Sequence, residues 1–166
     1  MKRQLALTAA AILGFASAHA QQHDHDMEQH RQQAAATAAT SPAGDGRQAV
    51  RFPKTLREHT LANMRDHLLA LQQIQEALAK QEFDKAGDIA EQRLGMSSLA
   101  LHEAHEVANY MPRGMQDAGT AMHRDASRFA VAAKDAGATG DVKPALAALA
   151  SVTAQCVACH AGYRVQ

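Results

Sequence analysis

The residues Cys156-Val157-Ala158-Cys159-His160 form a CxxCH motif near the end of the chain. Two thiols with this spacing can add to the two vinyl groups of one haem, and the adjacent imidazole can ligate the haem iron. A thioredoxin-like redox site would need a βαβ context, which the sequence lacks. A zinc site would need two further ligands at matching spacing, and the chain has only two cysteines. The motif therefore predicts one covalently attached haem c, with its iron bound by His160.

The first 20 residues have the pattern of a bacterial secretory signal peptide. Lys2 and Arg3 form a positive start, positions 5–18 are apolar, and Ala18-His19-Ala20 matches an A-x-A cleavage site. The apolar stretch is too short to span a membrane. Haem is attached to CxxCH motifs outside the cytoplasm, so we expect a periplasmic protein. An uncleaved anchor is the alternative.

After cleavage the chain would divide into a leader at 21–50 and a haem domain at 51–166. Loss of Lys2 and Arg3 leaves 15 basic residues against 17 acidic ones, which provides no electrostatic footprint for nucleic acid or an anionic membrane. The leader is polar and low in complexity, so we expect it to be disordered. No membrane-spanning segment is expected after signal cleavage.

From residue 51 onward the pattern is helical, and no strand is expected. Apolar residues recur at helical spacing, and proline and glycine separate the segments. The expected helices cover 53–80, 84–110, 118–136 and a last segment capped by Asp141. Four helices with short connections predict an all-α, antiparallel four-helix bundle. The residues expected to face inward are Leu61, Met64, Leu68, Leu71, Leu78, Ile89, Met96, Leu99, Val107, Met122, Ala126, Phe129, Ala133, Leu146, Leu149, Val152 and Cys156.

The last helix resembles the C-terminal signature of the cytochrome c-prime family, in which CxxCH is followed two residues later by Tyr-Arg, here Tyr163-Arg164. The segment 56–67, LREHTLANMRDH, is similar to the family's opening pattern of aromatic-Arg, an apolar residue four positions later, then Met-x-x-His. Leu56 replaces the usual aromatic residue, and the chain has no Trp. The resemblance covers about 51–166 and implies a four-helix bundle, a fold that the family is known for.

The resemblance implies roles for residues on the proximal side of the haem. Cys156 and Cys159 would be the thioether anchors, and His160 would be the proximal ligand. Arg164 would lie beside the proximal imidazole.

On the other side, the resemblance implies that Arg57 binds a haem propionate and that Leu61 covers the distal face of the iron. The iron would then be five-coordinate and open to diatomic gases such as NO and CO. Met64 lies one turn from Leu61 and is an alternative distal ligand, which would make a six-coordinate electron carrier. His67 is a further alternative ligand.

These assignments predict a protein that transfers electrons or binds a diatomic gas, and that is not an enzyme. A peroxidase-like haem enzyme is the alternative, although peroxidase chemistry requires a distal His with a nearby Arg to help break an O–O bond. The redox partner is unknown, and a homodimer is an open alternative. Peroxide turnover by the ferric protein would separate the two classes.

The chain has ten histidines, and some of them suggest other metal sites. His102 and His105 would share one face of a helix, and His123 could add a third ligand. A solvated helix face is the simpler interpretation of that pair. The simpler interpretation of Met111, Met115 and Met122 is packing rather than soft-metal binding. Cleavage after residue 20 would expose Gln21-Gln22-His23, a potential Cu(II) chelate unless the terminal Gln cyclises.

Overall fold

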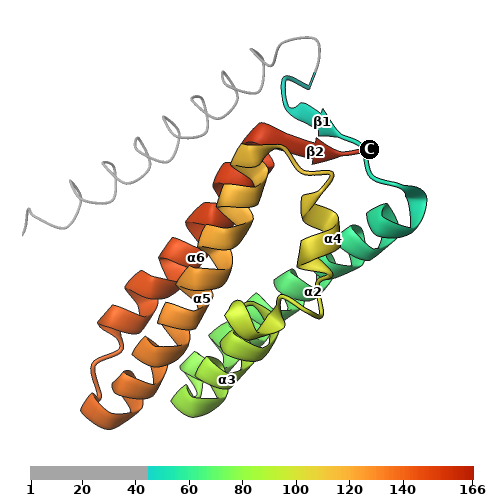
Figure 1. The fold of residues 1–166 in the computed structure, drawn as a ribbon. Helices are drawn as coiled ribbons and strands as arrows, with labels where there is room; N and C mark the ends of the chain where they lie inside the picture. Colours follow the sequence, from blue (N-terminus) through green and yellow to red (C-terminus); the bar gives the residue numbers. More distant parts are fainter. Residues whose placement is uncertain (1–44) are drawn as a thin grey trace, which may run out of the picture. The chain divides into compact units, whose positions relative to one another are not determined.

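The computed structural model describes residues 45–166, and the expected signal peptide and all but the end of the expected leader lie outside this range. Within it the chain is all-α apart from two three-residue strands (Figure 1). The elements in chain order are β1 (Gln48–Val50), α2 (Lys54–Ala79), α3 (Phe83–Arg93), the 3-10 helix η1 (Met96–Ser98), α4 (Ala104–Ala108), α5 (Arg113–Thr139), α6 (Lys143–Gly162) and β2 (Tyr163–Val165).

Proline and glycine set the ends of the long helices. Pro53 and Pro112 stand directly before α2 and α5, where a fixed φ is favourable and no backbone N–H is needed. Gly140 ends α5 in the left-handed conformation with φ 77°. The Asp141 carboxylate accepts the Lys143 backbone N–H at 3.0 Å at the start of α6. The predicted first, third and fourth helices are therefore confirmed, although α5 begins five residues earlier than expected.

The predicted helix at 84–110 is wrong as a single element. It is divided into α3, η1 and α4, with Gly95 extended and Glu103 in the left-handed region at φ 48°. Side chains satisfy the backbone groups that the break frees. Met96 N–H donates to Ser127 Oγ at 2.9 Å, and Ser97 N–H donates to Glu91 Oε1 at 3.1 Å.

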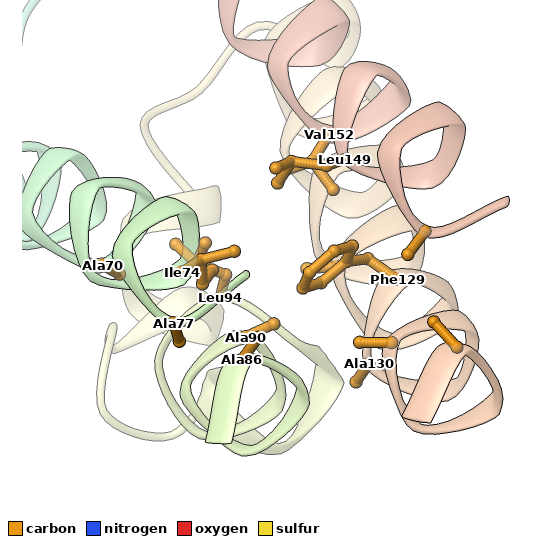
Figure 2. Close-up of a cluster of buried hydrophobic side chains, with 14 of the residues drawn as sticks. Ala70, Ile74, Ala77, Ala86, Ala90, Leu94, Phe129, Ala130, Leu149 and Val152 are labelled. Carbon is orange, nitrogen blue, oxygen red and sulfur yellow. The ribbon is translucent and has the colours of Figure 1, made fainter. Parts of the chain in front are cut away.

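The helices pack in the order α2 on α3, α3 on α5, and α5 on α6. Short connections make α2–α3 and α5–α6 antiparallel neighbours, and Figure 1 shows α5 and α6 side by side. Figure 2 shows Ile74 and Leu94 pointing toward Phe129, Leu149 and Val152. These side chains and a surrounding set of alanines form the main core, in which Phe129 is fully buried.

The buried stripe of α2 differs from the predicted one. It consists of Leu56, Thr60, His67, Ala70, Ile74 and Ala77. Leu68 is 69% exposed, while Leu71 and Leu78 only flank the core. The alanines allow α3 to approach closely, so the contact face is rotated toward the smaller residues. In α6, similarly, Leu149 and Val152 are buried as predicted, whereas Leu146 is half-exposed.

Strands β1 and β2 were not predicted. They pair in parallel, with Gln48 opposite Tyr163 and Val50 opposite Val165. Residues 48–50 belong to the segment that we expected to be disordered, and the pairing gives them an ordered partner. The pairing joins the chain just before α2 to the residues that follow the CxxCH motif.

By length and composition alone, α6 could cross a membrane, and it is the one helix in residues 45–166 of which this is true. The expectation that no membrane span follows the signal peptide stays a prediction. The helix packs along α5, and Ala145, Leu149 and Val152 are buried. The apolar composition of α6 is therefore also explained by its packing against α5.

A Gly87→Ala substitution is expected to destabilise the protein at the contact between α3 and α5. A Cβ at Gly87 would lie 2.8 Å from the Ala130 carbonyl oxygen, which belongs to the backbone and cannot easily move. Overpacking of this kind costs about 1–3 kcal/mol, which outweighs the gain of about 1 kcal/mol from better helix propensity. Urea denaturation measures the change. Gly119→Ala in α5, where a Cβ would meet nothing within 4 Å, should be neutral or stabilising; equal effects of the two substitutions would refute this packing argument.

Candidate functional site

The CxxCH motif lies on the last turns of α6. Cys156 and Cys159 are both free thiols and both half-buried, while the His160 side chain is exposed. Cys156 packs against the main core, and its thiol faces the Val152 carbonyl oxygen at 3.6 Å. Cys159 packs against a second apolar cluster. The helix therefore directs both thiols toward apolar surfaces.

Burial raises the pKa of both thiols. Desolvation is the main cause at both residues. At Cys159 the neighbouring Cys156 raises the pKa further. Redox-active CxxC pairs have the opposite property, because an electropositive setting lowers the pKa of the attacking cysteine. The geometry and the protonation state therefore fit a site for covalent attachment better than a thiol–disulfide site.

The second apolar cluster gathers around Cys159 at the end of α6. It combines residues from β1, the start of α2, α4, the start of α5 and β2, which lie far apart in the sequence. Its members are Val50, Phe52, Leu56, Val107 and Met115, with Met111, Cys159, Tyr163 and Val165 packed against them. The sequence prediction missed the contribution of Val50 and Phe52, although their alternation around the polar Arg51 is a weak strand signal.

The α2 residues that the resemblance singled out have different surroundings. Arg57 is exposed and Leu61 is half-buried, and neither lines the pocket described below. Met64 does line that pocket. Arg164 is half-buried in β2, opposite Ala49. Leu61 and Met64 are both half-buried, and neither belongs to the buried stripe of α2.

A pocket of about 180 Å³ lies between α2, α4 with its preceding turn, and α5. It is smaller than the roughly 300–1,000 Å³ of typical ligand sites, so it fits an ion with water or a small molecule better than a large cofactor. None of its lining residues comes from α6. They are Thr60, Asn63, Met64, His67, Leu99, His102, Ala104, Val107, Ala108, Met111, Gln116, Gly119, Thr120, Met122 and His123.

Three histidines from separate segments meet in this pocket. The Nε2 atoms of His67 and His102 are 3.3 Å apart, and their ring centres are 4.7 Å apart. The His123 ring centre is 5.3 Å from that of His102 and 6.3 Å from that of His67. His67 and His123 are each 8% exposed. We refer to these three residues as the histidine cluster.

Burial favours the uncharged form of all three rings. Burial is the main cause of the lowered pKa at each, and it takes the pKa values of His67 and His102 to about 4. The neighbouring imidazoles lower the pKa of His67 and His102 further. Next to His67 in the sequence, Asp66 forms an ion pair with Arg93. This ion pair joins α2 to α3, and the hydrogen bond from Arg93 lowers the pKa of Asp66.

The interpretation of His102 and His105 as a solvated helix face is confirmed for His105, which is exposed, and is wrong for His102, which lines the pocket. The helix begins only at Ala104, so the two residues do not share one face of a regular helix. His123 does accompany His102, as proposed, while His67 supplies the partner that the sequence did not indicate. Met115 and Met122 are buried in apolar clusters, which confirms their interpretation as packing residues. Gln21-Gln22-His23 lies outside the described residues.

Acidification is expected to destabilise the metal-free protein through His67. Its pKa is about 4 in the folded chain and about 6.5 when unfolded, so the unfolded state binds the extra proton between these values. The free energy of unfolding should therefore be flat above pH 6.5 and should fall by about 2 kcal/mol from pH 7 to pH 5 on account of this group. Urea titrations with EDTA at both pH values measure it. A His67→Gln variant that keeps the full pH dependence would contradict the assignment.

Comparisons with models of protein families, with curated proteins and with solved structures each found no match.

Proposed function

We propose that this chain is a periplasmic c-type cytochrome, of the same general type as the cytochrome c-prime family, that transfers electrons or binds a diatomic gas such as NO or CO. The observation that carries the proposal is the setting of the CxxCH motif on α6. The two thiols are one turn apart, half-buried and directed toward apolar surfaces, with a histidine immediately after them.

The residues present fit a haem at this position. Cys156 and Cys159 would hold it by thioether bonds, and His160, which is exposed and available, would supply the proximal nitrogen. A bound haem would supply a one-electron couple and an iron to which diatomic ligands can bind. The apolar side chains around Cys156 and Cys159 would exclude water from one side of the group, which favours a stable redox or gas-binding centre.

The helix order supports a four-helix bundle as the setting. The two antiparallel pairs α2–α3 and α5–α6 meet through the contact of α3 with α5, and all four helices contribute side chains to one core. The short segment of η1 and α4 would then be an elaborated connection between the second and third long helices.

The experiment that tests the proposal is export of the full chain in cells that attach haem to periplasmic proteins. Haem colour that stays with the polypeptide on a denaturing gel is the expected result. A colourless polypeptide, produced beside a coloured control cytochrome in the same cells, would reject the proposal.

A second candidate concerns the distal side of the iron. An open site with Leu61 as the cover is the form that the resemblance favours, and it predicts that CO changes the spectrum of the reduced protein. A six-coordinate electron carrier with Met64 as the distal ligand is the alternative, because Met64 lies one turn from Leu61 on α2.

The absorption spectrum of the reduced protein separates the two forms. We expect a high-spin spectrum that responds to CO. A sharp low-spin α band that ignores CO would overturn the open site. If Met64→Leu then restored the CO response while Met111→Leu did not, the six-coordinate form would be established.

A further inference from the structure

We infer that His67, His102 and His123 form a binding site for a divalent transition-metal ion of the zinc type, separate from the proposed haem. The three rings come from α2, from the turn before α4 and from α5, which surround the pocket. Imidazole is a preferred ligand of zinc, copper and nickel ions, and three histidines with one open position make a known class of zinc site.

The separation of His67 and His102 already fits a shared ion. Two nitrogens that bind one tetrahedral zinc ion at 2.0–2.1 Å lie about 3.3 Å apart. The Nε2 atoms of these two residues are 3.3 Å apart. The two rings therefore meet through the atoms that would bind the metal.

Hydrogen bonds at the far side of two rings direct the Nε2 lone pairs toward the pocket. His123 Nδ1 donates to the Leu94 carbonyl oxygen at 2.7 Å, which leaves Nε2 without a proton. At His102, the Ser98 hydroxyl donates its proton to the Gly95 carbonyl at 2.7 Å, so Ser98 Oγ can only accept from His102 Nδ1, at 3.4 Å. Partners of this kind orient the histidine ligands of metal sites.

The third ligand needs a small adjustment. Among residues 45–166, no group of three or more His, Cys, Asp or Glu side chains could hold a metal ion as the side chains stand. Around a tetrahedral ion the ring centres would be roughly 5 Å apart. The distances of 4.7 and 5.3 Å agree with this, and the distance of 6.3 Å between His67 and His123 must shorten by about 1 Å. The cluster lines an open pocket, which leaves space for the rings to adjust.

The pocket also provides for the fourth position. Thr60 lines it, is 3% exposed, and its Oγ1 is buried with no hydrogen-bond partner in the described part of the chain. A buried hydroxyl normally has a partner. A metal-bound water in the pocket could donate a hydrogen bond to this oxygen. In the absence of metal, His67 Nε2 donates to the unprotonated His102 Nε2, so binding of an ion shifts the His67 proton to Nδ1.

The test is zinc binding to the full exported protein, stripped with EDTA and then titrated with Zn²⁺ by calorimetry at pH 7. The leader histidines are the same in every variant, so any zinc that they bind is common to all of them. The histidine cluster is therefore tested by the difference in zinc binding between the variants and the parent chain. We expect His102→Gln and His123→Gln to lose one equivalent of zinc, or to bind it at least about a hundredfold more weakly, since even outer-shell partners are worth 10–100-fold. His105→Gln, which alters an exposed histidine three residues from His102, should match the parent chain.

Thermal unfolding provides a second readout that does not depend on the variants folding well. An ion held by three segments of the folded chain must raise the Tm of the parent protein and of His105→Gln, whereas an ion on the leader need not. We expect a rise of several degrees in these two proteins and none in His102→Gln. Equal zinc uptake by all variants, or no rise in the Tm of the parent protein, would overturn the inference and leave His67 and His102 as a hydrogen-bonded pair.

Discussion

Replacing both Cys156 and Cys159 with alanine is expected to abolish covalent haem attachment completely. Both thiols are directed toward apolar surfaces, and the chain has no other cysteine that could replace them. Each single replacement should leave at most one thioether bond and should lower the yield of haem-bearing protein strongly. Haem staining after denaturing electrophoresis, normalised to polypeptide, measures the effect.

The matched control lies between the two cysteines. Val157 is 64% exposed on α6, so Val157→Ala changes the motif without removing a thiol or a core contact. It should retain the parent haem content. Haem that remains bound under denaturing conditions in the double alanine variant would show that the CxxCH motif is not the attachment site.

Phe129→Ala is expected to cause the largest loss of stability from a single substitution in the core. Phe129 is fully buried on α5, and Figure 2 shows it among Ile74, Leu94, Leu149 and Val152. Its neighbours belong to helices α2 and α6 and the end of α3, so they cannot all move into the space that the ring leaves. Removal of a buried aromatic ring costs about 3–5 kcal/mol. Urea denaturation followed by circular dichroism measures the loss.

Val131→Ala is the control on the same helix, because Val131 is 62% exposed. Its effect should stay within about 0.5 kcal/mol, as for most surface substitutions. A loss below about 1 kcal/mol for Phe129→Ala would mean that this ring is not the centre at which the helices meet.

The long helices could be predicted because local signals mark them. Pro53, Pro112 and Gly140 stand at helix ends, and the stripe on α5 from Met122 to Ala133 is buried as its spacing indicates. The break between α3 and α4 could not be predicted in this way. The backbone groups at Leu94 and Met96 are satisfied by His123 and Ser127, which are about thirty residues away.

The same break explains what was missed at the histidine cluster. A continuous helix would have put His102 and His105 on one face, and the sequence offered no reason to separate them. In the structure His102 lies in the turn before α4, and its ring faces His67, with the two Nε2 atoms 3.3 Å apart. A histidine on the buried stripe of α2 was the available signal, since Leu56, Thr60 and Ile74 share that stripe with His67.

The face of α2 was predicted wrongly because large side chains were given more weight than small ones. Leu68 and Leu69 are exposed, while Ala70 and Ala77 are fully buried. Close packing of α2 on α3 needs small residues at the contact, and hydrophobicity alone does not report this.

The intact mass of the exported protein is the most direct test of the central claim. The account predicts a single species whose mass equals residues 21–166 plus one haem joined by two thioether bonds, and whose reduced pyridine complex has the spectrum of a haem with both vinyl groups saturated. A mature chain with the mass of the polypeptide alone, or with Cys156 and Cys159 joined in a disulfide, would contradict it.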